Sequence, residues 1–132
     1  MEAALELIET YEELERTYAP FVDDGRAWKG DLGGLEAIVS GRDRALERGA
    51  ALMARVRELW GPWEASGPDA QTRARVFGAR NRLVELGLSA SKADTTLLGK
   101  IRRRADDLRR SAADTTLRHK ASVAYRKGRA GL

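Results

Sequence analysis

The residues that could carry chemistry are few and widely spaced in this chain of 132 residues. His119 is the only histidine, and the nearest acid before it, Asp114, lies five residues away. A general base or a metal ligand needs further polar groups at a fixed spacing, so we interpret His119 as a solvated residue on a polar helix. Cysteine is absent, which removes disulfides and the commonest zinc ligand.

Two adjacent carboxylates, Asp106 and Asp107, also fail to form a catalytic pair. On a helix they point about 100° apart and do not share one site. We expect them to form ion pairs one turn away, with Arg102, Arg103 or Arg110. Gly33-Gly34 lacks the flanking pattern of a phosphate-binding loop. The sequence therefore predicts a protein that is not an enzyme, with no catalytic, cofactor-binding or metal-binding residues.

Charge is distributed unevenly, although the net charge is only +4. Residues 1–24 hold eight acids and one base, whereas residues 71–132 hold sixteen bases and five acids. Such asymmetry indicates either pairing within the fold or an acidic partner. Our first interpretation is that the basic stretch over residues 102–120 pairs with the acidic first helix. Nucleic-acid binding is the alternative, but the stretch has no interleaved aromatic residues for base stacking.

The helical elements that position these residues follow from hydrophobic periodicity. The first seam, with steps of three and four residues, consists of Ala4, Leu7, Tyr11, Leu14, Tyr18, Phe21, Gly25 and Trp28. It predicts a helix over about 2–29, kinked or broken at Pro20. Gly30 is expected to stop this helix, and Asp31 to cap the next one.

A second seam predicts a helix over about 32–60. Its members are Leu35, Ile38, Arg42, Ala45, Gly49, Leu52, Val56, Leu59 and Trp63, and a parallel row consists of Val39, Leu46, Met53 and Trp60. The two rows together are wide enough to pack against two neighbours. Ala45 and Gly49 would allow close approach of a neighbouring helix. We expect Gly61-Pro62 to end this helix, and Trp60 and Trp63 to cover one end of the core or to anchor a partner.

After a predicted loop over 61–69, a third helix is expected over about 70–127, with Asp69 as its cap and a break possible near 87–91. Its seam fades beyond Leu108, so residues after about 112 are expected to be frayed or ordered by a partner. The predicted fold is all-α: three long antiparallel helices in one domain, residues 1–132, as an elongated bundle or coiled-coil-like hairpin. The acidic N-terminus and the lack of a long apolar run predict a cytoplasmic protein without a membrane span.

The layout resembles the FlgN family of flagellar export chaperones along nearly the whole chain. A Glu-rich first helix leads into Gly30-Asp31-Leu32 and a second helix that contains Leu35-Glu36, similar to the family's first helix junction. The end of the third helix, Tyr125-Arg126-Lys127-Gly128, resembles the family's terminal Tyr-x-x-Gly. The asparagine-rich segment often seen early in the family's third helix is represented only by Asn81. The related FliT-type chaperones remain an alternative.

The resemblance implies a chaperone that binds the C-terminal helical segment of hook–filament junction proteins, prevents early assembly and delivers them to the export apparatus. The client-binding region of the family maps onto Leu98, Ile101, Ala105, Leu108, Ala112, Leu117, Val123 and Tyr125. A polar helix that docks an amphipathic client helix fits the helix-in-groove mode of recognition. The alternatives are a nucleic-acid-associated helical protein and a structural coiled-coil dimer. The client's identity and the oligomeric state, monomer or dimer, stay open.

Overall fold

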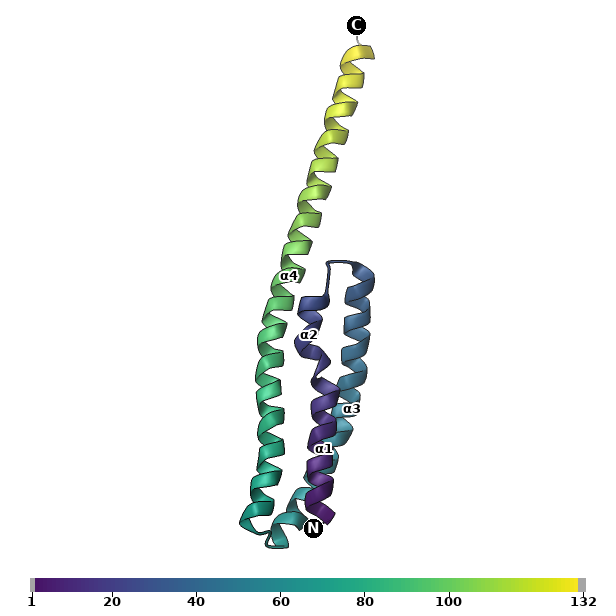
Figure 1. The fold of residues 1–132 in the computed structure, drawn as a ribbon. Helices are drawn as coiled ribbons and strands as arrows, with labels where there is room; N and C mark the ends of the chain where they lie inside the picture. The colour runs from purple at the N-terminus through teal and green to yellow at the C-terminus, as the bar shows by residue number, and fades with distance from the viewer. Residues whose placement is uncertain (1, 131–132) are drawn as a thin grey trace. The chain divides into compact units, whose positions relative to one another are not determined.

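The computed structural model describes residues 2–130, and every regular element within them is an α-helix (Figure 1). The helices are α1 (Glu2–Tyr18), α2 (Pro20–Ala27), α3 (Leu32–Ala65) and α4 (Ala70–Ala130). The all-α class predicted from the sequence is therefore confirmed. The chain divides into two compact units, Met1–Leu97 (unit 1) and Leu98–Leu132 (unit 2), and the single domain over 1–132 stays a prediction. Residues 1, 131 and 132 of the predicted domain lie outside the described residues.

The core of unit 1 is formed by three helices, α1, α3 and the first part of α4, packed against one another. Its buried residues are Ala4, Leu7, Tyr11 and Leu14 of α1, Leu52, Val56 and Trp63 of α3, and Val76 and Ala79 of α4. Leu7 and Leu14 have no exposed surface. The α1 members belong to the first predicted seam. The glutamates of α1 lie on other faces of the helix. Amphipathic periodicity thus positions the first helix against the rest of the unit.

The break at Pro20 interrupts the helix for one residue but leaves the seam in place. Ala19 keeps helical angles (φ −52°, ψ −40°), and its N–H donates to the Glu15 carbonyl at 2.9 Å. Because Pro20 has no N–H, it is tolerated as the first residue of α2. Beyond it, Gly25 and Trp28 are again buried. The interruption predicted at Pro20 is confirmed as a break rather than a kink, and the first seam continues through two successive helices (Figure 1).

The start of α3 matches the sequence prediction. Gly30 adopts a positive φ of 90°, a conformation that glycine accepts without strain. The Asp31 side chain accepts a hydrogen bond from the Gly34 N–H at 2.7 Å, so it caps the helix as expected. The Trp28 indole N–H donates to the Asp31 carbonyl at 2.8 Å. This contact joins the end of α2 to the start of α3.

The predicted end of this helix at Gly61-Pro62 was wrong, because α3 continues through Pro62 to Ala65. One further turn places Trp63 in the core, where it is 1% exposed, and this burial compensates for the hydrogen bond that proline removes. The stop comes at Gly67, whose φ of 64° places it in the left-handed region and whose N–H donates to the Glu64 carbonyl at 3.1 Å.

Aromatic residues cover one end of the core, as predicted for Trp60 and Trp63. The two indole rings meet edge-to-face at 5.1 Å, and Phe77 of α4 lies 5.8 Å from Trp60 and 6.4 Å from Trp63. Such edge-to-face contacts stabilise beyond the area that they bury. Trp63 lies fully inside and Trp60 is half-buried. This cluster connects α3 to α4 close to the turn between them.

The second apolar row of α3 packs only over part of its length. Met53 and Trp60 are half-buried against the core, whereas Val39 and Leu46 are 51% and 55% exposed. The expectation that the full row would pack against a second neighbour is therefore wrong for its first half. Along that half, Arg42 of α3 forms an ion pair with Asp94 of α4 at 2.6 Å.

Helix α4 passes through Gly87 and Ser89–Ser91 without interruption and remains helical to Ala130. Asp69 caps its start, since its carboxylate accepts from the Thr72 N–H at 2.7 Å. This hydrogen bond is the main reason that the pKa of Asp69 lies below its ordinary value. Within the described residues, no helix has the length and apolar character that crossing a membrane requires.

Candidate functional site

The eight residues predicted to bind a partner all lie in unit 2, on residues 98–125 of α4. Among residues 98–128, where the structure describes side chains, none is buried. Leu98, Leu108, Leu117 and Tyr125 are 53%, 54%, 64% and 68% exposed. Ile101 is half-buried. This surface of exposed apolar side chains contrasts with the hydrophobic cluster of unit 1, which contains none of them.

The helix brings some of these residues onto one face and separates others. At about 100° per residue, five residues occupy a band roughly 80° wide, which we call the α4 seam: Leu98, Ile101, Ala105, Leu108 and Ala112. Val123 falls in line with this band. Leu117 and Tyr125 point about 140° away from its centre, on either side. The structure thus supports a shared surface for six of the eight predicted residues.

The acids of α1 form ion pairs within unit 1, whereas pairing of α1 with the basic stretch over 102–120 stays a prediction. Glu6 pairs with Arg55 of α3 at 2.6 Å, and Glu13 pairs with Arg48 of the same helix. Glu15 lies 3.8 Å from an arginine in the first part of α4, Arg82. The sequence alone did not identify these arginines, and the structure shows that they pair with glutamates of α1.

The basic stretch keeps most of its cations unpaired. Within it, Arg109 forms an ion pair with Asp106 at 3.3 Å, three residues apart on the same helix, whereas Asp106 was expected to pair with Arg102, Arg103 or Arg110. Among described residues, five cations form no ion pair: Arg102, Arg103, Arg110, Arg118 and Lys120. All of them are exposed. These five exposed cations give the surface of unit 2 a positive charge.

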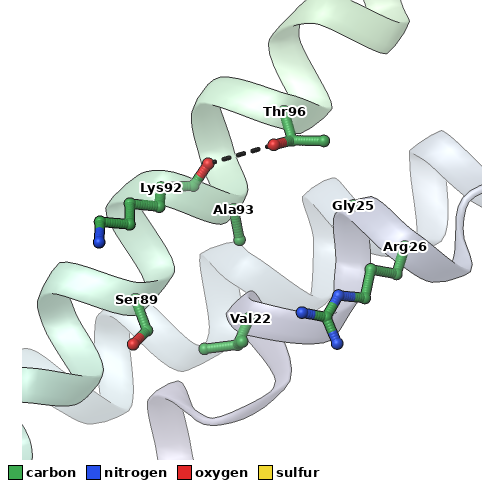
Figure 2. A pocket seen from close by; sticks show the side chains of 7 residues that line it. All are labelled: Val22, Gly25, Arg26, Ser89, Lys92, Ala93 and Thr96. Atoms are coloured by element: carbon green, nitrogen blue, oxygen red, sulfur yellow. Dashed lines mark hydrogen bonds between the residues drawn. The ribbon is translucent and has the colours of Figure 1, made fainter.

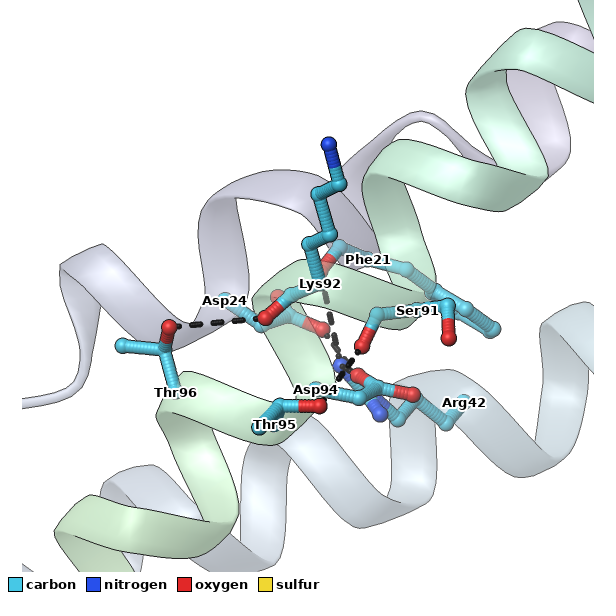
Figure 3. A network of polar contacts seen from close by, with 8 residues as sticks. All are labelled: Phe21, Asp24, Arg42, Ser91, Lys92, Asp94, Thr95 and Thr96. Atoms are coloured by element: carbon cyan, nitrogen blue, oxygen red, sulfur yellow. Dashed lines mark hydrogen bonds and ion pairs between the residues drawn. The ribbon is translucent and has the colours of Figure 1, made fainter.

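A polar cluster within unit 1, missed at the sequence level as a site, is centred on Arg42 of α3 (Figure 3). Its guanidinium lies 3.2 Å from an Asp24 oxygen on α2 and 2.6 Å from an Asp94 oxygen on α4. The group also donates to the Phe21 carbonyl at 3.4 Å and lies 4.7 Å from the centre of the Phe21 ring. One side chain therefore connects three helices.

Burial and pairing act in opposite directions on this guanidinium. Desolvation by burial lowers the pKa of Arg42, but the hydrogen bonds and charges of Asp94 and Asp24 outweigh it and raise the pKa above its ordinary value. The cation is therefore held in its charged form. The signal in the sequence was a charged residue at a seam position, which indicates a partnered charge.

A cavity of about 300 Å³ lies between α2 and α4 within unit 1 (Figure 2). The side chains of Val22 and Ala93 point into the space between the two helices. A Cβ atom built on Gly25 would lie 3.1 Å from the Ala93 carbonyl oxygen, so glycine permits this close helix approach. Polar residues complete the lining: Arg26, Ser89, Lys92 and Thr96. The sequence marked Gly25 only as the one seam member that is not apolar.

His119 is exposed on α4. Among the described residues, no group of three or more His, Cys, Asp or Glu side chains is placed to hold a metal ion.

No family model matches this chain, and comparison with curated proteins and with solved structures gives no significant match.

Proposed function

We propose that this protein is a client-binding chaperone of the flagellar export type, which receives an amphipathic helix of its client along the α4 seam. The observation that carries the proposal is that leucines of this seam are more than half exposed, although they continue a heptad pattern. In unit 1, the same pattern is buried against other helices. A heptad face that is left exposed favours helix docking as its purpose.

The proposal gives the two units separate tasks. Unit 1 supplies a packed helical scaffold, in which we infer that α3 runs antiparallel to α1. Support comes from the order of the ion pairs: Glu6 pairs with Arg55, and Glu13, seven residues later, pairs with Arg48, seven residues earlier. Unit 2 supplies the docking surface. Ordering a polar helix against a client costs free energy, and this moderates the affinity and permits release.

The first test measures binding of purified junction-protein C-terminal segments to the full chain by calorimetry. A double variant, Leu98→Ser with Leu108→Ser, removes two apolar contacts worth about 1.5–3 kcal/mol each when buried, so the affinity should fall at least tenfold. The matched control is Leu117→Ser, which removes an exposed leucine from another face of α4 and should leave the affinity unchanged.

The outcomes separate the parts of the proposal. Equal loss of affinity in the double variant and the control would show that the α4 seam is not the docking face. Binding of a helical client other than a flagellar one would retain the docking function and remove the flagellar assignment. A truncation after Ala112 that keeps full affinity would confine the site to the seam itself.

A second candidate is nucleic-acid binding, which is favoured by the five exposed cations without ion-pair partners among the described residues. Phosphate contacts release counterions, so this binding should weaken steeply between 50 and 200 mM salt. Docking of apolar side chains should change far less over that range. A titration with duplex DNA and with client peptide at both salt concentrations distinguishes the two functions.

A further inference from the structure

We infer that the partner received by the α4 seam is an acidic amphipathic helix, with glutamate or aspartate on both sides of its own apolar stripe. This inference rests on the proposed docking function and specifies the partner's chemistry. It follows from where the charges lie around α4. A partner of this kind complements an arginine border that the fold leaves exposed.

With Leu98 at position a of a heptad, the α4 seam occupies the a and d positions, and the e and g positions border it. Over residues 98–118 the bordering residues are Arg102, Arg104, Arg109, Ser111, Thr116 and Arg118. Every charged residue among them is an arginine. All are exposed. A docked helix must therefore meet arginines along both edges of its contact.

The acids of this segment lie elsewhere. Asp106 takes position b, from which it pairs with the border residue Arg109, and Asp107 and Asp114 take position c. The remaining cations, including Arg103 and Arg110 at position f, face outward. Segment 98–132 as a whole holds eleven bases and three acids, an excess of eight positive charges. Because no acid lies at positions e and g, every charged residue of the border is positive.

Because every charged residue of the border is positive, we do not expect a second copy of this segment to dock on the α4 seam. In a parallel pair the g and e' positions meet, and in an antiparallel pair e meets e' and g meets g'. Neither arrangement sets an arginine of the border against an acid, and arginine facing arginine at these positions is destabilising. Only a helix with acidic borders converts the same positions into ion pairs.

Unit 1 contains an instance of this chemistry. Glu6 and Glu13, seven residues apart on α1, pair with Arg55 and Arg48, seven residues apart on α3. The arginines there come from the longer helix and the acids from the shorter one. The chain thus already uses an acidic helix against an arginine-bearing one, and the α4 border presents the arginine half of such a pair.

The experiment uses the full chain and three synthetic three-heptad peptides. Each peptide has leucine at a and d, and carries glutamate, glutamine or lysine at e and g. We expect the glutamate peptide to bind roughly tenfold more tightly than the glutamine peptide at 50 mM salt, from several weak ion pairs. The lysine peptide should bind more weakly than either. Analytical ultracentrifugation of the chain alone should show no association through this segment.

Two triple variants locate the effect. The border variant carries Arg102→Glu, Arg109→Glu and Arg118→Glu. The outer variant carries Arg103→Glu, Arg110→Glu and Lys120→Glu, and changes the net charge by the same amount. We expect the border variant to reverse the order of the glutamate and lysine peptides, and the outer variant to keep it. Circular dichroism of both variants verifies that α4 remains helical.

Equal weakening of the glutamate peptide by both variants would overturn the inference, because the effect would then come from general electrostatic attraction. So would equal affinity for the glutamate and glutamine peptides. In both cases, docking of a helix on the seam would survive. If no peptide binds and Leu98→Ser with Leu108→Ser leaves client affinity unchanged, the docking function itself fails. Displacement of the glutamate peptide from the unmodified chain by duplex DNA would overturn the inference as well, because it would assign the arginines to phosphate binding.

Discussion

Unit 1 and unit 2 use the same heptad spacing with opposite results. In unit 1 the seam of α1 is buried, and its glutamates form ion pairs with arginines of neighbouring helices. In unit 2 the α4 seam keeps leucines more than half exposed, and five cations lack ion-pair partners among the described residues. The comparison teaches that a seam indicates helix contact but does not say whether the contact lies within the chain.

The largest expected effect comes from the aromatic end of unit 1. Trp63→Ala removes a side chain that is 1% exposed and should lower the free energy of unfolding by about 3–5 kcal/mol. Leu98→Ala in unit 2 should cost less than about 1 kcal/mol, since that leucine is 53% exposed. Urea denaturation followed by circular dichroism measures both. Similar losses in the two variants would contradict the division between units.

A second variant tests which part of the Trp63 side chain stabilises unit 1. Its indole N–H is buried and has no hydrogen-bond partner among the described residues, so Trp63→Phe should cost clearly less than Trp63→Ala.

The next largest effect on stability is expected where α1 and α3 pack closely. A Cβ atom on Gly49 would overlap the Tyr18 hydroxyl, so Gly49→Ala should destabilise by about 1–3 kcal/mol. On the same helix, Gly41 has no atom within 4 Å of a built Cβ. Gly41→Ala should therefore stabilise by about 0.5–1 kcal/mol through helix propensity. Thermal melts of the two variants should move in opposite directions; a shared direction would show that helix propensity outweighs packing here.

A smaller effect is expected from the polar cluster. Arg42→Met keeps the length of the side chain but leaves Asp24 and Asp94 without their cation, and should cost about 1–2 kcal/mol. The control is Arg109→Met in unit 2, whose ion pair is exposed and should cost less than about 0.5 kcal/mol. Hydrogen exchange at α2 should accelerate only in the first variant. Equal exchange in both would show that Arg42 does not hold α2 in place.

The smallest effect concerns the cap of α4. Because the pKa of Asp69 is lowered in the folded state, its contribution to stability is present above the ordinary value of 3.8 and is lost as the pH falls through the lower, folded value. Asp69→Asn keeps a capping side chain that does not titrate. The stability difference between the unmodified chain and the Asp69→Asn variant, measured by urea denaturation, should therefore shrink or reverse below about pH 4. A constant difference would exclude this carboxylate as the cause.

Periodicity and cap chemistry were enough to predict the helical class, the seam through Pro20 and the capping roles of Asp31 and Asp69. These features are local, because each depends on residues within one or two turns. The end of α3 was mispredicted because burial of Trp63, a tertiary effect, overrides the local signal of Pro62. The arginines that pair with Glu6, Glu13 and Glu15 within unit 1 were not predicted, because charge totals do not specify which residues lie close together.

The candidate site was predictable in position but not in composition. The spacing of Leu98, Ile101 and Leu108 located the α4 seam. Assignment of Leu117 and Tyr125 to the same surface came from the family resemblance, and the helix places them on other faces. The Arg42 cluster and the cavity beside Gly25 join residues far apart in the sequence. Neither could be recognised before the helices were brought together.

Hydrogen exchange of the full chain, alone and with a bound client segment, tests the central claim most directly. The account predicts that amides of residues 98–112 exchange much faster than those of α1 in the free protein, since an unpacked helix opens easily. Binding of the client should then protect residues 98–112 selectively. Slow exchange of this segment without any client, or client-induced protection confined to unit 1, would contradict the account.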